Sequence, residues 1–191
     1  MAPRPDIARV AGGAALFPTA LGPCGLAWRD DVLTSVQLPE ADERRTAHRL
    51  ARAAGGTMPA ASPAGAPAAV QRAVEAMTAL LQGEPVDLGW VAIDLDSAAP
   101  FEQAVLGTTR TIPFGSSLTY GQVAAAIGEP GAAQAVGRAL GANRWPIVVP
   151  CHRVLGAGGA LTGFSAAGGV ATKRRMLLIE GCPAVPPSLF D

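Results

Sequence analysis

The sequence has few aromatic residues, few cysteines and no long apolar run. Aromatic residues make up 5% of the 191 residues and charged residues 16%, while hydrophobic residues reach 49%. Such a composition supports a packed core and excludes global disorder. No apolar run approaches the roughly 18 residues that span a bilayer, and the N-terminus lacks the basic-then-apolar order of a signal peptide. We therefore expect a soluble, unsecreted protein of the bacterial cytosol with no membrane partner.

The three cysteines, Cys24, Cys151 and Cys182, show no CxxC spacing. This pattern argues against a disulfide framework and a structural zinc site, so we expect free thiols, no metal and no cofactor. The net charge is zero, but the halves differ. Residues 1–98 hold 8 Arg and 11 acidic residues, a charge of −3, and residues 99–191 hold 7 Lys or Arg and 4 acidic residues, a charge of +3. Charge therefore favours a nucleic-acid partner only weakly, and only for the second half.

The first half reads as a β-meander followed by helices, with a Gly/Pro/Ala-rich loop at 55–67 that we expect to be flexible. Val70, Val74, Met77 and Leu81 recur with the period of a helix that ends at Gly83. The expected elements are strands at 26–28 and 32–38 around a turn at 29–31, helices at 42–54 and 68–81, and a strand at 86–95.

The second half reads as mostly helical. Its expected elements are helices at 101–112, 120–127, 132–140 and 173–179, and a buried strand at 147–149. Thr119 is a candidate cap for the second of these helices, and Met176, Leu177 and Ile179 are expected to face inward in the last. Two short helices across the turn Gly128–Gly131 have the spacing of a helix-turn-helix, although most such pairs are ordinary helical hairpins.

The chemistry-bearing pattern is the PCHRV segment that contains Cys151 and His152. A thiol is a nucleophile only as thiolate, and a neighbouring imidazole can take its proton. Adjacent side chains of an extended chain point to opposite faces, so either the chain turns sharply here or a water molecule relays the proton. Taken alone, Cys151 is more often a small buried hydrophobic residue and His152 a chance neighbour.

The surrounding motifs change that interpretation. IPFGSSLTYGQVA, GAAQAVGRALGAN, IVVPCHRVL, GFS and GGVATKRRMLLIEG, spread over residues 100–181, resemble the O6-alkylguanine-DNA alkyltransferases. This family is also called the methylated-DNA–protein-cysteine methyltransferases, and PCHRV is its signature. The resemblance implies direct, single-turnover repair, in which an alkyl group moves from O6-alkylguanine in double-stranded DNA to Cys151. Whether O4-alkylthymine or larger adducts are accepted stays open.

The resemblance also implies roles for individual residues. Cys151 is the nucleophile, His152 the base acting through water, Glu180 its orienter, Asn143 a brace for the cysteine turn, and Tyr120 a phosphate contact and proton donor. The base is extruded from the duplex, and Ser165, Phe164 and the backbone of Cys151 and Val154 bind it. The helix at 132–140 enters the minor groove. The implied DNA-binding residues are Tyr120, Gly121, Gln134, Ala135 and Arg138.

Each of these residues also has an ordinary reading. Asn143 alone is more often a helix C-cap, Tyr120 a packing residue and Glu180 a solvated carboxylate at a helix end. Arg153 is equally suited to a phosphate contact and to a buried pair with a carboxylate. Only the joint spacing of these residues favours the functional reading.

Three segments depart from the family pattern. Gln134 stands where the family usually has an Arg finger that fills the gap left by the flipped base, and Arg138 is a partial substitute one turn later. Arg144-Trp145 stands where a Pro usually follows the Asn, and Trp145 either packs under the cysteine segment or alters the groove. Ala166-Ala167 look like two extra residues in the loop after Ser165.

The expected fold is α+β. A small N-terminal antiparallel sheet with helices, residues 1–96 (ribonuclease-H-like in the family), precedes a mostly helical domain, residues 97–191, with the helix-turn-helix and the cysteine. We expect a monomer. Two alternatives stay open: a module that recognises alkylated DNA without efficient transfer, and a thiol enzyme or redox sensor unrelated to DNA.

Overall fold

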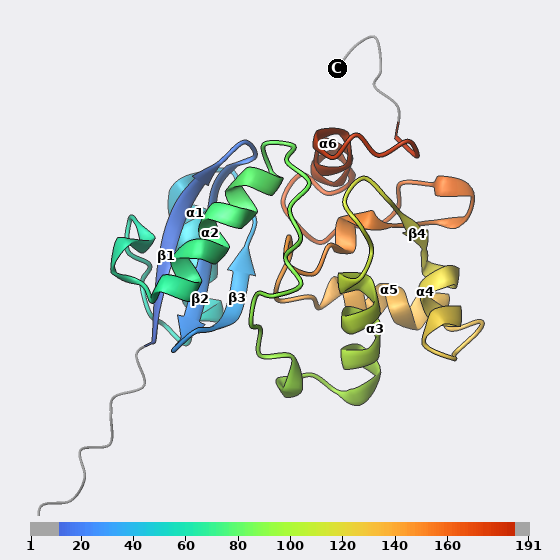
Figure 1. Ribbon diagram of the computed structural model, residues 1–191, viewed down its shortest axis with the longest axis horizontal. Helices are drawn as coiled ribbons and strands as arrows, with labels where there is room; N and C mark the ends of the chain where they lie inside the picture. The colour runs from blue at the N-terminus through green and yellow to red at the C-terminus, as the bar shows by residue number, and fades with distance from the viewer. Residues whose placement is uncertain (1–11, 186–191) are drawn as a thin grey trace, which may run out of the picture.

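The computed structural model describes residues 12–185 as an α+β fold with two halves side by side (Figure 1). The strands are β1 Gly12–Thr19, β2 Gly22–Arg29, β3 Val32–Gln37, β4 Leu118–Thr119 and β5 Val154–Leu155. The α-helices are α1 Glu43–Ala53, α2 Ala68–Leu80, α3 Pro100–Arg110, α4 Tyr120–Ala126, α5 Ala133–Gly141 and α6 Val170–Ile179. Short 3₁₀ turns lie at Pro63–Gly65, Leu95–Ser97, Cys151–Arg153 and Ala157–Gly159.

The first half is an antiparallel sheet in the order β1-β2-β3, with α1 and α2 on opposite faces. Side chains of a strand alternate between faces, so Leu16 packs toward Leu50 of α1 and Phe17 joins the main core. Gly25 lets α1 approach closely, because a Cβ at this position would lie 2.6 Å from Leu50. The hairpin around Asp30 and Asp31 confirms the predicted turn.

Both predicted helices of this half are confirmed. Asp42 caps α1 by accepting from the backbone N–H of Arg45 at 2.7 Å. The chain after α2 reverses at Gly83, where φ is 98°. The loop at 55–67 lies against the sheet, because Ala60 exchanges backbone hydrogen bonds with Ala14 and Leu16 at 2.8 and 2.9 Å. The expectation that it is a loop was right.

The strand predicted at 86–95 was wrong. Asp87 accepts from the N–H of Gly89 at 2.8 Å, which turns the chain away from an extended path. Leu88 and Val91 are buried as anchors of a connecting segment, and Ile93 makes one isolated bridge to Leu33 of β3. The apolar pattern of residues 86–95 indicated burial, but it did not reveal the turn at Asp87–Gly89.

The strand predicted at 147–149 was also wrong, although its residues are fully buried as expected. Ile147 has φ of 76°, and Val149 donates to the carbonyl of Trp145 at 2.8 Å, so this segment is a tight turn. Pro146 and Pro150 flank it, and neither has an N–H for a sheet ladder. A short apolar run alone did not distinguish a buried strand from a buried turn.

The second half packs α3, α4, α5 and α6 around a second part of the core, as predicted. Thr119 forms a capping box with Gln122: Gln122 N donates to Thr119 Oγ1 at 3.1 Å, and Thr119 N donates to Gln122 Oε1 at 2.7 Å. The cap fixes the start of α4, and α5 follows across the turn as the second helix of the pair. In α6, Met176 and Leu177 are buried, but Ile179 is only half-buried, which corrects the expected inward set. Within residues 12–185, no helix is both long and apolar enough to cross a membrane.

Candidate active site

Cys151 opens a 3₁₀ turn, Cys151–Arg153, that joins the buried turn before it to β5. Of the two alternatives, a sharp turn or a relay through water, the sharp turn is present in the structure. The residue is half-buried and lines a cavity of about 450 Å³. The other lining residues come from α4, from α5 and from the loop after β5: Tyr120, Gly137, Leu140, Gly141, Thr162, Gly163, Phe164 and Ser165. The predicted nucleophile thus has access to a space for a ligand.

Asn143 holds the cysteine segment in place just beyond the end of α5. Its Nδ2 donates to the carbonyl of Val149 at 3.0 Å, and its Oδ1 accepts from the N–H of Trp145 at 2.9 Å. Cys151 N donates to the same Val149 carbonyl at 2.8 Å. Both arms of the amide are therefore engaged, which supports the expected bracing role.

Two opposing effects act on the thiol. Burial raises the pKa of Cys151 above its ordinary value of 9.0, while the Asn143 side chain and the Lys173 charge act to lower it. A thiol in this state is protonated at neutral pH, so a base is required before it can attack a carbon atom.

His152, Arg153 and Glu180 form a buried network behind the cysteine. His152 Nε2 lies 2.8 Å from Glu180 Oε1. Arg153 donates from Nε to Oε2 and from Nη2 to Oε1 of Glu180, both at 2.9 Å. Gly115 N also donates to Oε2 at 3.3 Å. The buried-carboxylate reading of Arg153 is the one that the structure supports.

The network determines the protonation state of His152. Burial alone raises the pKa of Glu180, but hydrogen bonds from His152 and Arg153 bring it down to about 2. Burial lowers the pKa of His152 more than Glu180 raises it, so the imidazole is neutral. An ionised carboxylate only accepts hydrogen bonds, which assigns the ring proton to Nε2. The lone pair then lies on Nδ1, a buried atom with no hydrogen-bond partner among the described residues.

Lys173 belongs to this site, and sequence reasoning missed it. Its side chain is fully buried, and Nζ donates to the carbonyls of Val154 at 2.6 Å and Thr162 at 3.0 Å. Nζ also lies 5.6 Å from the centre of the Tyr120 ring. Lys173, Met176, Leu177 and Glu180 are spaced along one helical stripe, and all four are buried. In the sequence, this spacing already indicated that Lys173 lies on the buried face of the helix.

Tyr120 lies at the start of α4, where it borders two cavities. Its hydroxyl donates to Thr162 O at 3.5 Å, and burial is the main cause of the rise in its pKa. The second cavity has about 430 Å³ and is lined by Thr119, Tyr120, Gly121, Ala133, Gln134, Gly137 and Ala157. Among the predicted DNA-binding residues, Gly121 and Gln134 line this cavity beside Tyr120.

The remaining predicted residues are placed less directly. Arg138 is exposed on α5 and Ala135 half-buried, and neither lines the cavity beside Tyr120. Val154 is fully buried and does not line the cysteine cavity. Its N–H donates to the Cys151 carbonyl and its carbonyl accepts from Lys173. Its N–H is therefore already engaged, and its contact with a base stays a prediction.

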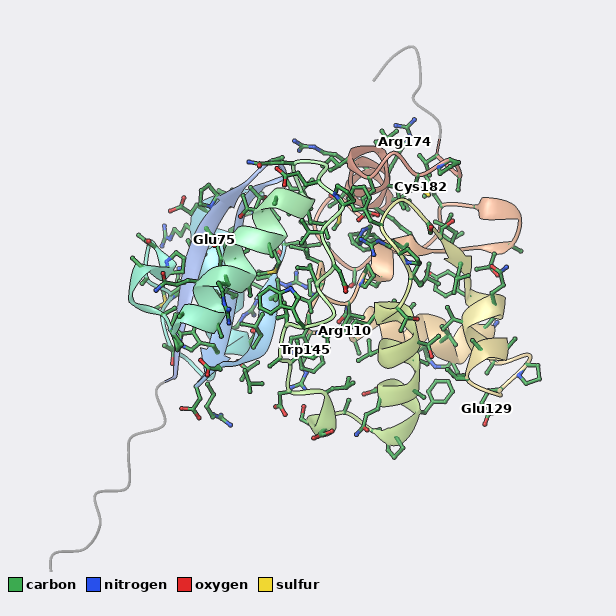
Figure 2. All side chains as sticks on the ribbon, viewed as in Figure 1. Glu75, Arg110, Glu129, Trp145, Arg174 and Cys182 are labelled. Atoms are coloured by element: carbon green, nitrogen blue, oxygen red, sulfur yellow. The ribbon has the colours of Figure 1, made fainter. Side chains whose placement is uncertain are left out.

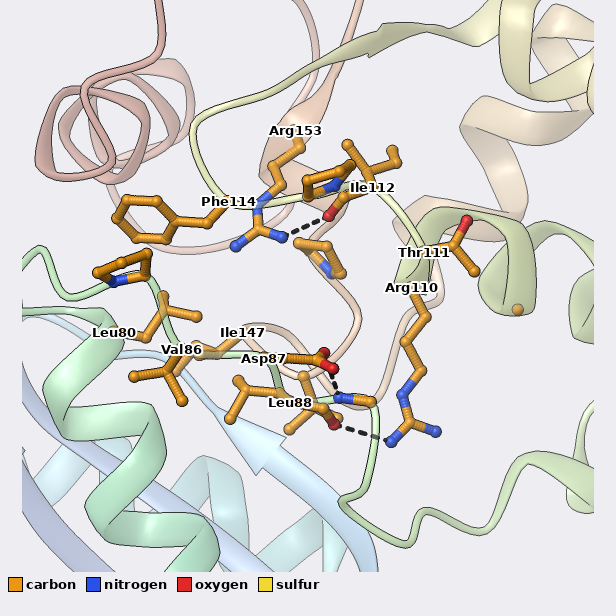
Figure 3. Close-up of a pocket in the computed structure, with 16 residues that line it drawn as sticks. Leu80, Val86, Asp87, Leu88, Arg110, Thr111, Ile112, Phe114, Ile147 and Arg153 are labelled. Carbon is orange, nitrogen blue, oxygen red and sulfur yellow. Dashed lines mark hydrogen bonds between the residues drawn. The ribbon is translucent and has the colours of Figure 1, made fainter.

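A larger cavity, of about 540 Å³, lies between the two halves and does not include Cys151 (Figure 3). Its lining contains Asp87, Arg110 and Ile147, with Arg153 at the opposite side. Arg153 Nη1 donates to the Ile112 carbonyl at 2.6 Å there, so this arginine links the cavity wall to Glu180. Arg153 of the buried His152–Arg153–Glu180 network thus lines this cavity, whereas Cys151 does not.

Residues 100–182 match the family described as "6-O-methylguanine DNA methyltransferase, DNA binding domain". Fold and match together define the class of protein: a DNA-binding protein with a cysteine-lined cavity beside its helix pair. A methylated-DNA–protein-cysteine methyltransferase of Mycobacterium bovis is 45% identical over 126 residues, 65% of this chain and 74% of that protein. One of Salmonella typhimurium is 55% identical over 82 residues, 43% of this chain and 47% of that protein.

Solved structures agree with this match. The Mycobacterium tuberculosis O6-methylguanine methyltransferase is similar with a TM-score of 0.70 at 36% identity, over 95% of this chain and 100% of that chain. Mycobacterium tuberculosis OGT in complex with DNA is similar with a TM-score of 0.70 at 35% identity, over 94% and 99% of the two chains. The chain belongs to the methylated-DNA–protein-cysteine methyltransferase family, and it is a DNA-binding methyltransferase of DNA alkyl repair.

Proposed function

We propose that this protein repairs O6-alkylguanine in double-stranded DNA by moving the alkyl group onto Sγ of Cys151. The observation that carries the proposal is the buried Nδ1 of His152, which has no hydrogen-bond partner within residues 12–185 and is next in the chain to a thiol that lines an open cavity. A neutral imidazole held by a carboxylate beside a nucleophile has the arrangement of a nucleophile–base–orienter triad.

The first step is activation of the thiol. His152 Nδ1 takes the proton of Cys151 through a water molecule, and Glu180 stabilises the resulting imidazolium. Asn143 and Lys173 favour the thiolate, the former by a hydrogen bond and the latter by its charge. Both effects oppose burial, which raises the pKa of the thiol.

The second step is an SN2 displacement. A bond forms between Sγ and the alkyl carbon while the bond from that carbon to O6 breaks, and the electron pair stays on the guanine. Tyr120 gives a proton to the leaving base, and the proton held by His152 restores the tyrosine through solvent. The products are S-alkylcysteine and guanine. Since nothing cleaves the thioether, each molecule reacts once.

The base must leave the duplex to reach Cys151. We propose that the flipped guanine occupies the cavity of about 450 Å³, in contact with Ser165 and Phe164. The backbone of Cys151 and, at the edge of the cavity, that of Val154 bind its edge. Lys173 holds that carbonyl and the Thr162 carbonyl in position, and so acts as a positioning residue for the pocket.

We propose that α5 enters the minor groove and that the protein acts as a monomer. The cavity between α4 and α5 lies next to the base pocket and shares Tyr120 and Gly137 with it. Gln134 on its rim takes the place of the flipped base, with Arg138 one turn later on the exposed side of the helix. Tyr120, Gly121 and Ala135 contact the sugar-phosphate backbone of the DNA. Because phosphates supply much of this affinity, binding should weaken steeply with salt.

We also propose that residues 1–96 and 97–191 are separate domains, the second holding the whole reaction site. All three cysteines are free thiols, which is typical of a reducing compartment and supports a cytosolic location. O4-alkylthymine is a second substrate under this proposal, since its alkyl carbon is also bound to an exocyclic oxygen.

The deciding experiment is intact mass spectrometry after mixing the protein with a duplex that contains O6-methylguanine. The expected gain is about 14 Da, one CH₂, localised to Cys151. Cys151→Ala should gain nothing and still bind the duplex. No gain in the wild-type protein with retained preference for the lesion would support the recognition module instead. A duplex with O4-methylthymine tests the second substrate in the same way.

A further inference from the structure

Trp145 connects the sheet of the first half to the cysteine segment of the second half. It is fully buried, and in Figure 2 it lies between the two halves. Its indole Nε1 donates to the Leu33 carbonyl of β3 at 2.8 Å. The neighbouring Arg144 carbonyl accepts from the N–H of Val36 at 2.8 Å, so β3 binds this dipeptide at two points.

The backbone of Trp145 engages the site itself. Its N–H donates to Asn143 Oδ1 at 2.9 Å, and its carbonyl accepts from Val149 at 2.8 Å. Asn143 and Val149 are the groups that hold the turn before Cys151. One residue is thus bonded to the sheet through its side chain and to the cysteine brace through its backbone.

Arg144 covers the exposed side of this contact. Its guanidinium carbon lies 4.6 Å from the centre of the Trp145 ring, and its Nη2 donates to Ser97 Oγ. The Leu33 carbonyl also accepts from Asp94 N at 3.2 Å, so the segment that links the halves meets β3 at the same place. These bonds restrict where the indole can lie relative to the sheet.

We propose that Trp145 is a positioning residue through which the β1–β3 sheet sets the location of Cys151 for the transfer reaction. The inference rests on the proposed role of Cys151 as alkyl acceptor. A nucleophile displaced by about 1 Å can lose on the order of a hundredfold in rate. The residue acts on the thiol and leaves the α4–α5 face untouched, so its loss should lower the rate of transfer without changing DNA affinity.

Trp145→Phe removes the indole N–H and keeps an aromatic ring. The expected result is a fall of about tenfold or more in the maximal single-turnover rate of methyl transfer, with unchanged affinity for duplex DNA. Trp90→Phe is the matched control, since Trp90 is 50% exposed, and it should behave as wild type. An unchanged rate in Trp145→Phe, measured where both variants are fully folded, would overturn the proposal, as would an equal fall in Trp90→Phe.

Reaction of Cys151 with iodoacetamide gives a readout that does not depend on DNA or on transfer. Cys24 and Cys182 are buried, and burial raises the pKa of Cys24 to about 12, so modification of Cys151 can be followed by peptide mass. Trp145→Phe should shift the pH dependence of this reaction, because the Asn143 bond that acts on the thiol is loosened. If the wild-type protein accepts no methyl group but Trp145→Phe still shifts the pH dependence of the iodoacetamide reaction, only the proposed function is contradicted.

A protein with Trp28→Phe and Trp90→Phe keeps Trp145 as its one tryptophan and covers the case in which Trp145→Phe does not fold. Because the backbone of Trp145 is bonded to the groups that hold the cysteine turn, modification of Cys151 by iodoacetamide should change the emission of Trp145. The same treatment of the Cys151→Ala form should not. Identical emission before and after modification would contradict the coupling.

Discussion

Glu180 Oε1 lies 2.8 Å from His152 Nε2, and both side chains are buried. This contact joins α6 to the turn that carries Cys151, across 28 positions of sequence. Because Arg153 donates two hydrogen bonds to the same carboxylate, Glu180 stays ionised and the histidine keeps its proton on the ring nitrogen facing it. The imidazole therefore has a defined orientation, and its Nδ1 has no hydrogen-bond partner among the described residues.

We expect Glu180→Gln to lower the rate of methyl transfer by about a hundredfold or more, since an amide does not fix the tautomer of His152. Arg153 would lose its buried counter-charge, so the free energy of unfolding should fall by about 3 kcal/mol. Single-turnover kinetics and urea unfolding measure the two effects. Glu129→Gln, an exposed carboxylate, is the control, and a fully active Glu180→Gln would contradict the triad.

Stability should depend on pH through Glu180. The pKa of this group is about 2 in the folded protein and has an ordinary value of 4.5. A lowered pKa contributes stability that is complete above about pH 4.5 and is lost as pH falls toward 2, on the order of 3 kcal/mol in total. Urea unfolding at pH 7 and pH 3 measures this. The difference in the free energy of unfolding between pH 7 and pH 3 should be smaller in Glu180→Gln than in the wild-type protein. Equal differences in the two proteins would refute the role of Glu180 in this pH dependence.

We expect Lys173→Met to slow the reaction of Cys151 with iodoacetamide at neutral pH. The charge of Lys173 lowers the pKa of Cys151, so its removal should move the reactivity profile to higher pH. The Val154 and Thr162 carbonyls also lose a donor, which costs about 1–3 kcal/mol of stability each if they stay unpaired. Arg52→Met, at an exposed position of α1, is the matched control. An unshifted profile would show that the lysine has no electrostatic role.

We expect Gln134→Arg to raise the rate of transfer from a methylated duplex more than from the free base O6-methylguanine. An arginine is longer, stacks better and adds a cation beside the phosphates. Gln82→Arg adds the same charge at an exposed position after α2 and should not reproduce the effect. Equal acceleration on both substrates would contradict a role for residue 134 in filling the gap that the flipped base leaves in the duplex.

Several local features followed from the sequence. Thr119 predicted a helix start because its side chain can cap free backbone N–H groups, and that cap is present. The helix expected at 42–54 is also present, with Asp42 as its cap. The spacing of Val70, Val74 and Met77 predicted the buried face of α2. The PCHRV segment with Asn143 and Tyr120 predicted which residues line or support the cysteine cavity, and it also led to the family.

Other features needed the folded chain. Of two predicted strands, the one at 86–95 is a connecting segment with a turn and the one at 147–149 is a tight turn, because the backbone of each bonds to partners that pattern alone does not reveal. Lys173 was missed because a lysine is usually exposed, and only the carbonyls of Val154 and Thr162 make its burial tolerable. Trp145 was expected either to pack under the cysteine segment or to alter the DNA groove. Its backbone is bonded to the cysteine segment, and its additional bond to β3 was not foreseen.

The sequence by itself determined the helices with their caps, the hairpin, the cysteine and the residues around it, because capping, periodicity and turn chemistry act over a few neighbouring residues. Only the tertiary structure decided the protonation of His152, the burial of Lys173 and the link from Leu33 to Trp145. Each of these depends on a hydrogen bond between residues 11 to 112 positions apart, and such a bond exists only once packing has brought the two segments together.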